Sequence, residues 1–155
     1  MMVEFILNGT AVSCHAPANV ILLDLLRSEL GVLSVKRGCE QGECGACTVL
    51  LDGRSVNYCM VLAARIQGRE VTTIEGLKDE PVMVALREAF MEGGAVQCGF
   101  CTPGMLISAY ALLRDNPSPT SHEAKTGIEG NICRCTGYTL PIESILKAAE
   151  MTPHE

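Results

Sequence analysis

The chain has 155 residues, enough for one domain or two small ones, and 48% of them are hydrophobic. Its formal net charge of −6 argues against a nucleic-acid binder, which normally presents a basic face. No apolar run approaches the roughly 20 residues of a membrane-spanning helix, and the N-terminus lacks the features of a secretory signal. We therefore expect a cytoplasmic protein without membrane insertion.

The N-terminal part of the sequence predicts a hairpin followed by a helix. Residues 3–7 and 10–14 alternate as strands do, and the Asn8-Gly9 pair between them is typical of a type I′ turn. Between residues 21 and 30 the leucines recur at helical spacing, and Gly31 is a suitable C-cap.

Residues 38–59 carry the first chemical signal and read GCEQGECGACTVLLDGRSVNYC. The cysteine spacing is C-x4-C-x2-C followed by a fourth cysteine after eleven residues, the plant-type ferredoxin pattern for a [2Fe–2S] cluster. The four candidate ligands are Cys39, Cys44, Cys47 and Cys59. The Asp52-Gly53 pair predicts a hairpin turn between strands at 48–51 and 54–58, which would bring the fourth cysteine beside the third.

A further strand at 70–74 completes a unit of hairpin, helix, loop, hairpin and strand. This order is compatible with a β-grasp, ferredoxin-like domain over residues 1–76 of an α+β protein. Lys36 and Arg37 precede the cysteine loop, where they are either cationic partners of an anionic cluster or solvated surface charges.

Beyond residue 76 the pattern becomes helical, which predicts a four-helix bundle domain over residues 77–155. The expected helices run from Pro81 to Gly93, from the Thr102 cap to Arg114, from the Thr120 capping box to about Gly130, and around 141–149. Gly127 inside the third of these helices costs about 1 kcal/mol relative to alanine.

Two more cysteine pairs, Cys98-x2-Cys101 and Cys133-x-Cys135, are 31 residues apart. The helix between them and its return have comparable lengths, so both pairs are expected at one end of the bundle. A zinc ribbon normally has two C-x2-C knuckles about 15–20 residues apart, and a C-x-C pair fits that pattern poorly. A second [2Fe–2S] cluster is therefore favoured, zinc is the alternative, and disulfides come third.

At these residues the sequence resembles a known family. The segments QCGFCTPG (97–104) and GNICRCTGY (130–138), preceded by GCEQGECGACTV (38–49), are similar to the small iron–sulfur subunit of the molybdenum hydroxylases. Xanthine dehydrogenase, aldehyde oxidoreductase and aerobic carbon monoxide dehydrogenase belong to that family. The resemblance covers essentially the whole chain and assigns one cysteine set to each of two [2Fe–2S] clusters.

The resemblance also implies partners and a function. The chain would be the electron-transfer subunit of an oxidoreductase, with no substrate-binding active site of its own. A large subunit would hold molybdopterin and oxidise an aldehyde, N-heterocycle or purine, and a medium subunit would hold FAD. Electrons would pass from molybdopterin through the helical-domain cluster and then the ferredoxin-type cluster to the flavin. Because the sequence ends at 155, those cofactors are expected on separate polypeptides, in a heterotrimer or a dimer of heterotrimers.

The same resemblance implies roles for individual residues. Gln97 and Cys135 match the positions that approach the pterin, and Arg134 is a candidate for a partner contact or a surface salt bridge. Two other classes of protein stay open on the residues alone: a free-standing two-cluster ferredoxin and a zinc-stabilised binding module. The ninth cysteine, Cys14, shares a strand face with Val12 and is expected to be a buried, inert thiol.

Overall fold

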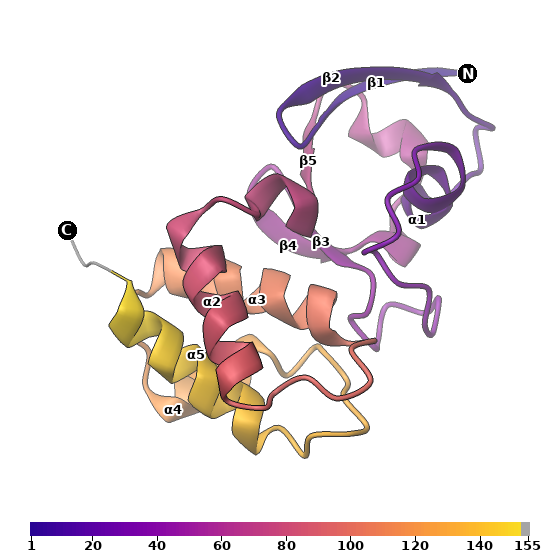
Figure 1. Ribbon diagram of the computed structural model, residues 1–155. Helices are drawn as coiled ribbons and strands as arrows, with labels where there is room; N and C mark the ends of the chain where they lie inside the picture. The colour runs from indigo at the N-terminus through magenta and orange to yellow at the C-terminus, as the bar shows by residue number, and fades with distance from the viewer. Residues whose placement is uncertain (153–155) are drawn as a thin grey trace.

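The computed structural model describes residues 1–152 and has an α+β fold, with a five-stranded sheet beside a layer of helices (Figure 1). The strands are β1 (Met2–Leu7), β2 (Thr10–His15), β3 (Thr48–Leu51), β4 (Arg54–Asn57) and β5 (Glu70–Thr72). Their order in the sheet is β2-β1-β5-β3-β4. Strands β1 and β5 run parallel, whereas the other neighbours are antiparallel.

Both predicted hairpins are confirmed, and their turns have the expected backbone. Asn8 and Gly9 have φ of 51° and 78°, and Asp52 and Gly53 have 48° and 78°. Two consecutive residues with positive φ define the type I′ turn, whose twist matches that of the flanking strands. In the second hairpin Leu51 pairs with Arg54 and Thr48 with Asn57, which is the register that the sequence predicts.

The predicted α-helix over residues 21–30 is wrong in type. One turn, α1 (Leu22–Asp24), is followed by the π-helical turn η1 (Leu25–Glu29), in which the Leu30 amide donates to the Leu25 carbonyl at 3.2 Å. The buried side chains form two adjacent pairs, Leu22 with Leu23 and Leu25 with Leu26, whereas Leu30 is only partly buried. A buried face this broad is wider than one α-helical stripe.

Four helices pack around a second core. They are α2 (Pro81–Glu92), α3 (Thr102–Asp115), α4 (Ser121–Gly127) and α5 (Thr139–Met151), with short η2 (Tyr58–Met60), η3 (Ala63–Ile66) and η4 (Ile74–Leu77) turns earlier in the chain. The capping box at Thr120 is confirmed: its amide donates to the Glu123 carboxylate at 2.7 Å, and the Glu123 amide donates to its hydroxyl at 3.2 Å.

Several element ends differ from the sequence expectations. The N-cap of α3 is Cys101 rather than Thr102, because the chain is already helical one residue earlier. Helix α4 ends at Gly127, where an added Cβ would lie 2.8 Å from Leu112 Cδ2 on α3. The glycine therefore permits close helix packing, which explains its presence inside a helix.

The two hydrophobic cores meet across β3, whose four residues are all buried. Val49 and Leu51 belong to the core under the sheet, whereas Leu50 belongs to the helical core on the other face. Cys14 is half-buried rather than buried, because β2 is an edge strand that is covered incompletely. Within residues 1–152, no helix is both long enough and apolar enough to cross a membrane.

Candidate metal centres

Eight of the nine cysteines gather where the sheet meets the helices. All nine are free thiols. The loop before β3, the loop into α3 and the loop into α5 lie on the same side of the molecule (Figure 1). The Ile132 amide of the last loop donates to the Cys44 carbonyl of the first at 2.9 Å. The loops that carry the two cysteine sets are therefore in direct contact.

In the first set, Cys39 lies inside a nest of backbone amides. Its sulfur accepts N–H groups from Gln41 at 3.3 Å and from Glu43 and Cys44 at 3.4 Å each. Gly42 has a φ of 78°, which turns these amides inward. The hydrogen bonds from Gln41, Cys44 and Glu43 lower the pKa of Cys39 to about 6. Donors around one sulfur are what an anionic iron–sulfur cluster requires.

The hairpin brings the other two thiols of the first set together. The Tyr58 amide lies 3.5 Å from the Cys47 carbonyl, which continues the β3–β4 register and places Cys59 beside Cys47 as predicted. Their side chains are buried, with exposed fractions of 3% for Cys47 and 6% for Cys59. Burial, and then the neighbouring Cys59 thiol, raise the pKa of Cys47.

The second set also consists of two neighbouring pairs. Cys98 and Cys135 are exposed and adjacent, whereas Cys101 and Cys133 form the inner pair. Burial, followed by the Cys133 thiol, raises the pKa of Cys101 to about 12. Burial also acts to raise the pKa of Cys133. Hydrogen bonds from the Thr136 hydroxyl, 3.2 Å away, and from nearby backbone amides have the larger effect, and the net result is a lowered pKa for Cys133.

This arrangement of donors fits a binuclear cluster. The thiols of each set approach one another two by two. Four thiolates shared between two irons bind a [2Fe–2S] cluster, whereas structural zinc needs four ligands around one ion. The chemistry of both sets therefore matches [2Fe–2S].

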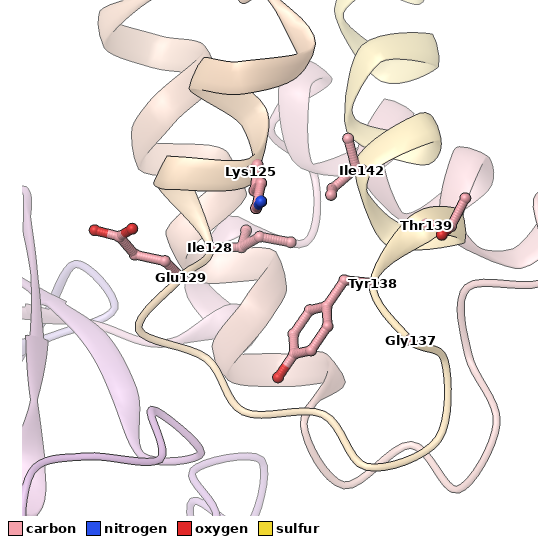
Figure 2. Close-up of a pocket in the computed structure, with 7 residues that line it drawn as sticks. All are labelled: Lys125, Ile128, Glu129, Gly137, Tyr138, Thr139 and Ile142. Carbon is pink, nitrogen blue, oxygen red and sulfur yellow. The ribbon is translucent and has the colours of Figure 1, made fainter.

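Tyr138 supports the second set from outside. Its hydroxyl accepts the Cys133 amide at 2.8 Å, and its backbone is left-handed with a φ of 70°. Figure 2 shows its ring extending from the loop before α5 toward the chain that follows α4, within a pocket of about 550 Å³. Lys125 and Glu129 are the charged residues that line this pocket.

The remaining candidates lie on the surface. Gln97 and Arg134 are exposed beside the second set. Arg37 forms ion pairs with Asp24 and, at 2.9 Å, with Glu40, so its charge is already neutralised. Lys36 donates to the Leu33 carbonyl at 2.9 Å. The cationic role considered for Arg37 is therefore not supported, whereas Lys36 keeps its charge and its role stays a prediction.

Sequence reasoning missed three polar residues that hold the loops, namely Thr48, Asn131 and Tyr138. Asn131 and Tyr138 stand inside the GNICRCTGY segment, so their place next to cysteines was the available signal. Nothing in that segment indicates which set each one serves, because the contact of Asn131 spans 86 residues of sequence.

Comparison with known proteins identifies the family. Residues 5–72 match the "2Fe-2S iron-sulfur cluster binding domain" family, and residues 73–149 match the "[2Fe-2S] binding domain" family. Over 132 residues the chain is 49% identical to the nicotinate dehydrogenase small FeS subunit of Eubacterium barkeri, covering 85% of this chain and 84% of the relative. The chain belongs to the iron–sulfur subunits of the molybdenum hydroxylases.

Solved structures agree with membership of this molybdenum hydroxylase family. Quinoline 2-oxidoreductase from Pseudomonas putida 86 superposes with a TM-score of 0.92 at 39% identity, covering 97% of this chain and 94% of the matched chain. The aldehyde oxidoreductase of Desulfovibrio desulfuricans ATCC 27774 gives 0.89 at 41% identity, covering 97% of this chain but only 17% of that longer chain. As an oxidoreductase iron–sulfur subunit of this family, the protein binds [2Fe–2S] clusters.

Proposed function

We propose that this iron–sulfur subunit relays electrons from a molybdopterin centre on a large subunit, through two [2Fe–2S] clusters, to a flavin on a medium subunit. The oxidation of an aldehyde, N-heterocycle or purine takes place on the large subunit. The observation that carries the proposal is the pairing of eight thiols into two adjacent sets whose loops share the Ile132–Cys44 hydrogen bond. Electron transfer weakens steeply with distance, so two redox groups held by touching loops suit a relay.

The proposed ligand sets are those that the cysteine spacing and the family resemblance predict, and the pairing of the thiols supports them. The first cluster is held by Cys39, Cys44, Cys47 and Cys59, and the second by Cys98, Cys101, Cys133 and Cys135. Bound clusters supply one-electron oxidation and reduction. The protein's own contribution is to supply the thiols, to surround Cys39 with amide donors and to bury the Cys47–Cys59 side.

The large subunit docks at the exposed edge of the second set. Cys135 and Gln97 are exposed there, which is compatible with the proximity to pterin that the family resemblance implies. The aldehyde oxidoreductase, in which the equivalent of this chain is 17% of one polypeptide, supports a permanent association with a much larger catalytic part. We place this subunit in a cytoplasmic heterotrimer or dimer of heterotrimers.

The proposed architecture is a β-grasp, ferredoxin-like domain over residues 1–76 and a four-helix bundle domain over 77–155, of which 153–155 lie outside the described residues. The separate cores on the two faces of β3 support this division. The two family matches, over 5–72 and 73–149, divide the chain at a similar place.

The test is iron and acid-labile sulfide analysis of the chain matured anaerobically with its partner subunits. About four irons and four sulfides per chain are expected, because each [2Fe–2S] cluster holds two of each. A colourless protein with zinc and no sulfide would contradict the proposal. Size-exclusion chromatography of the native complex provides the second arm, since a free-standing two-cluster ferredoxin would elute as a small monomer.

A further inference from the structure

Asn131 is close in sequence to the second cysteine set, but its side chain binds the loop that carries the first set. It lies two residues before Cys133 and is only 2% exposed. Its Nδ2 donates to the Gly45 carbonyl at 3.1 Å and lies 3.4 Å from the Thr48 hydroxyl oxygen. Gly45 stands between Cys44 and Cys47, so the amide of Asn131 holds the loop of the first cluster.

The hydrogen-bond network continues around the same loop. The Thr48 hydroxyl lies 2.7 Å from the Gly45 carbonyl oxygen and 3.2 Å from Asn57 Oδ1. Asn57 Nδ2 in turn donates to the Gly42 carbonyl at 2.7 Å. Side-chain amides thus bind the carbonyls of Gly42 and Gly45, which precede and follow Cys44 in the loop. Asn131 is the member of this network that comes from the helical half of the protein.

The backbone of the first ligand loop also lies in close contact with residues 130–132. A Cβ on Gly45 would lie 2.2 Å from the Gly130 carbonyl oxygen, and its φ is 68°. The Ile132 amide meets the Cys44 carbonyl in the same stretch. Residues 130–132 therefore pack directly against the first ligand loop, and the buried side-chain amide of Asn131 lies in the middle of this contact.

Tyr138, at the other end of the segment 130–138, makes the corresponding contacts in the loop of the second set. Its hydroxyl accepts the amide of Cys133 at 2.8 Å, and its own amide donates to the Thr136 hydroxyl at 3.2 Å. Both contacts stay within the loop of the second set. Tyr138 and Asn131 are seven positions apart, yet they hold different cysteine sets.

We propose that Asn131 is a positioning residue for the first [2Fe–2S] cluster and Tyr138 a positioning residue for the second. One segment, residues 130–138, then sets the geometry of both. The inference rests on the proposed ligand assignment. It predicts that two substitutions in a single motif act on different clusters, and that the more N-terminal one acts across the junction of the two halves.

The test uses the full chain matured with its partner subunits, reduced and examined by low-temperature EPR. Cys44→Ser removes the first cluster and so identifies its signal. In Asn131→Ala the g-values and midpoint potential of the first cluster shift, while those of the second keep their wild-type values. Iron release from the first site to a chelator accelerates roughly tenfold or more, the effect expected when a buried hydrogen-bonding partner is removed.

Tyr138→Phe is the matched control, because it removes one hydroxyl and keeps the ring. It shifts the EPR signal and accelerates iron release at the second site only. If Asn131→Ala does not accumulate as folded protein, the isosteric Thr48→Val breaks the same network from the opposite side and gives the same shift at the first cluster.

Two results separate the inference from the proposed function. A wild-type chain with far fewer than about four irons contradicts the ligand assignment, and the inference with it. A fully loaded wild type whose first-cluster signal is unchanged in Asn131→Ala or Thr48→Val overturns the inference alone. A shift of the second-cluster EPR signal in these variants, with the first-cluster signal unchanged, would also overturn the inference alone.

Discussion

Cys39 and Cys47 belong to one ligand loop but lie in opposite environments. Three backbone amides surround the sulfur of the half-buried Cys39 and lower its pKa to about 6. Cys47 is buried beside Cys59, which raises its pKa. Since the thiolate is the form that binds metal, Cys39 gives up its proton more readily than Cys47.

Alkylation of the full chain prepared without iron tests this difference. Because the pKa of Cys39 is about 6, its thiolate forms as pH rises through that value and is lost below it. Its reaction with iodoacetamide should therefore level off near pH 7, whereas an ordinary thiol continues to gain rate to about pH 8.5 and beyond. Mass spectrometry of each cysteine against pH provides the profile.

Cys14 is the internal comparison in that experiment, since burial followed by Glu29 raises its pKa. Its alkylation should continue to rise after that of Cys39 has reached its plateau. Circular dichroism should show that the iron-free chain is folded before the profile is read. A Cys39 midpoint near that of Cys14 would contradict the amide nest.

A tightly constrained contact between elements joins the first ligand loop to the start of α3. A Cβ on Gly104, in the first turn of that helix, would lie 2.2 Å from the Gly45 carbonyl oxygen. That neighbour is backbone and cannot move aside as a flexible side chain can. Close approach of the main chain, rather than helix propensity, therefore determines the residue at this position.

Gly104→Ala should destabilise the protein although alanine is the better helix former by about 1 kcal/mol. Overpacking of this kind typically costs about 1–3 kcal/mol, and a rigid neighbour favours the upper part of that range. The measurement is the urea midpoint of the loaded chain together with its iron content. Gly130→Ala is the matched control, because an added Cβ there meets no atom within 4 Å. Equal midpoints for the two variants would rule out the clash.

The N-terminus of α4 allows a second prediction at this scale. The Thr120 amide, and then its hydroxyl, lower the pKa of Glu123 through the capping box. Thr120→Ala should cost about 1 kcal/mol, the usual effect of removing an N-cap hydroxyl. Glu123→Gln should cost less, because glutamine also completes a capping box. Urea unfolding at neutral pH compares the two, and the reverse order would contradict the cap geometry.

Local signals explain which elements could be predicted from sequence. Asp52-Gly53 determines the register that brings Cys59 beside Cys47, and the capping box at Thr120 marks the start of a helix. The π-helical turn at Leu25–Glu29 has no comparable signal, because its leucine spacing also suits an α-helix. The Asn131–Gly45 contact leaves no periodic trace in the chain, since it joins segments far apart in sequence.

At the scale of the whole molecule, apolar side chains surround the exposed edge of the second set. Phe100 is 48% exposed and Ile132 is 56% exposed. They belong to the same loops as Cys98 and Cys135, whose thiols are exposed and adjacent. Apolar residues grouped in this way commonly mark a protein–protein contact. The proposed docking of the large subunit would cover them.

Phe100→Asp and Ile132→Asp should therefore weaken co-purification with the large subunit, because each would bury an unpaired charge in the contact. Both variants should keep their iron. Met91→Asp is the comparison: Met91 is 71% exposed on α2 and belongs to none of the cysteine loops. Subunit ratios after affinity capture measure the effect. Retention of the large subunit by both loop variants would exclude this surface as the contact.

The contacts that Asn131 and Ile132 make with the loop of Cys44 have a consequence for biosynthesis. A ribosome completes the four cysteines of the first set, Cys39 to Cys59, long before it reaches Asn131, which lies 86 positions beyond Gly45. Until then the nascent chain lacks the contacts that Asn131 and Ile132 make with that loop. Iron delivered during synthesis would meet the ligand loop without these contacts, whereas iron delivered to the complete chain would meet it with them.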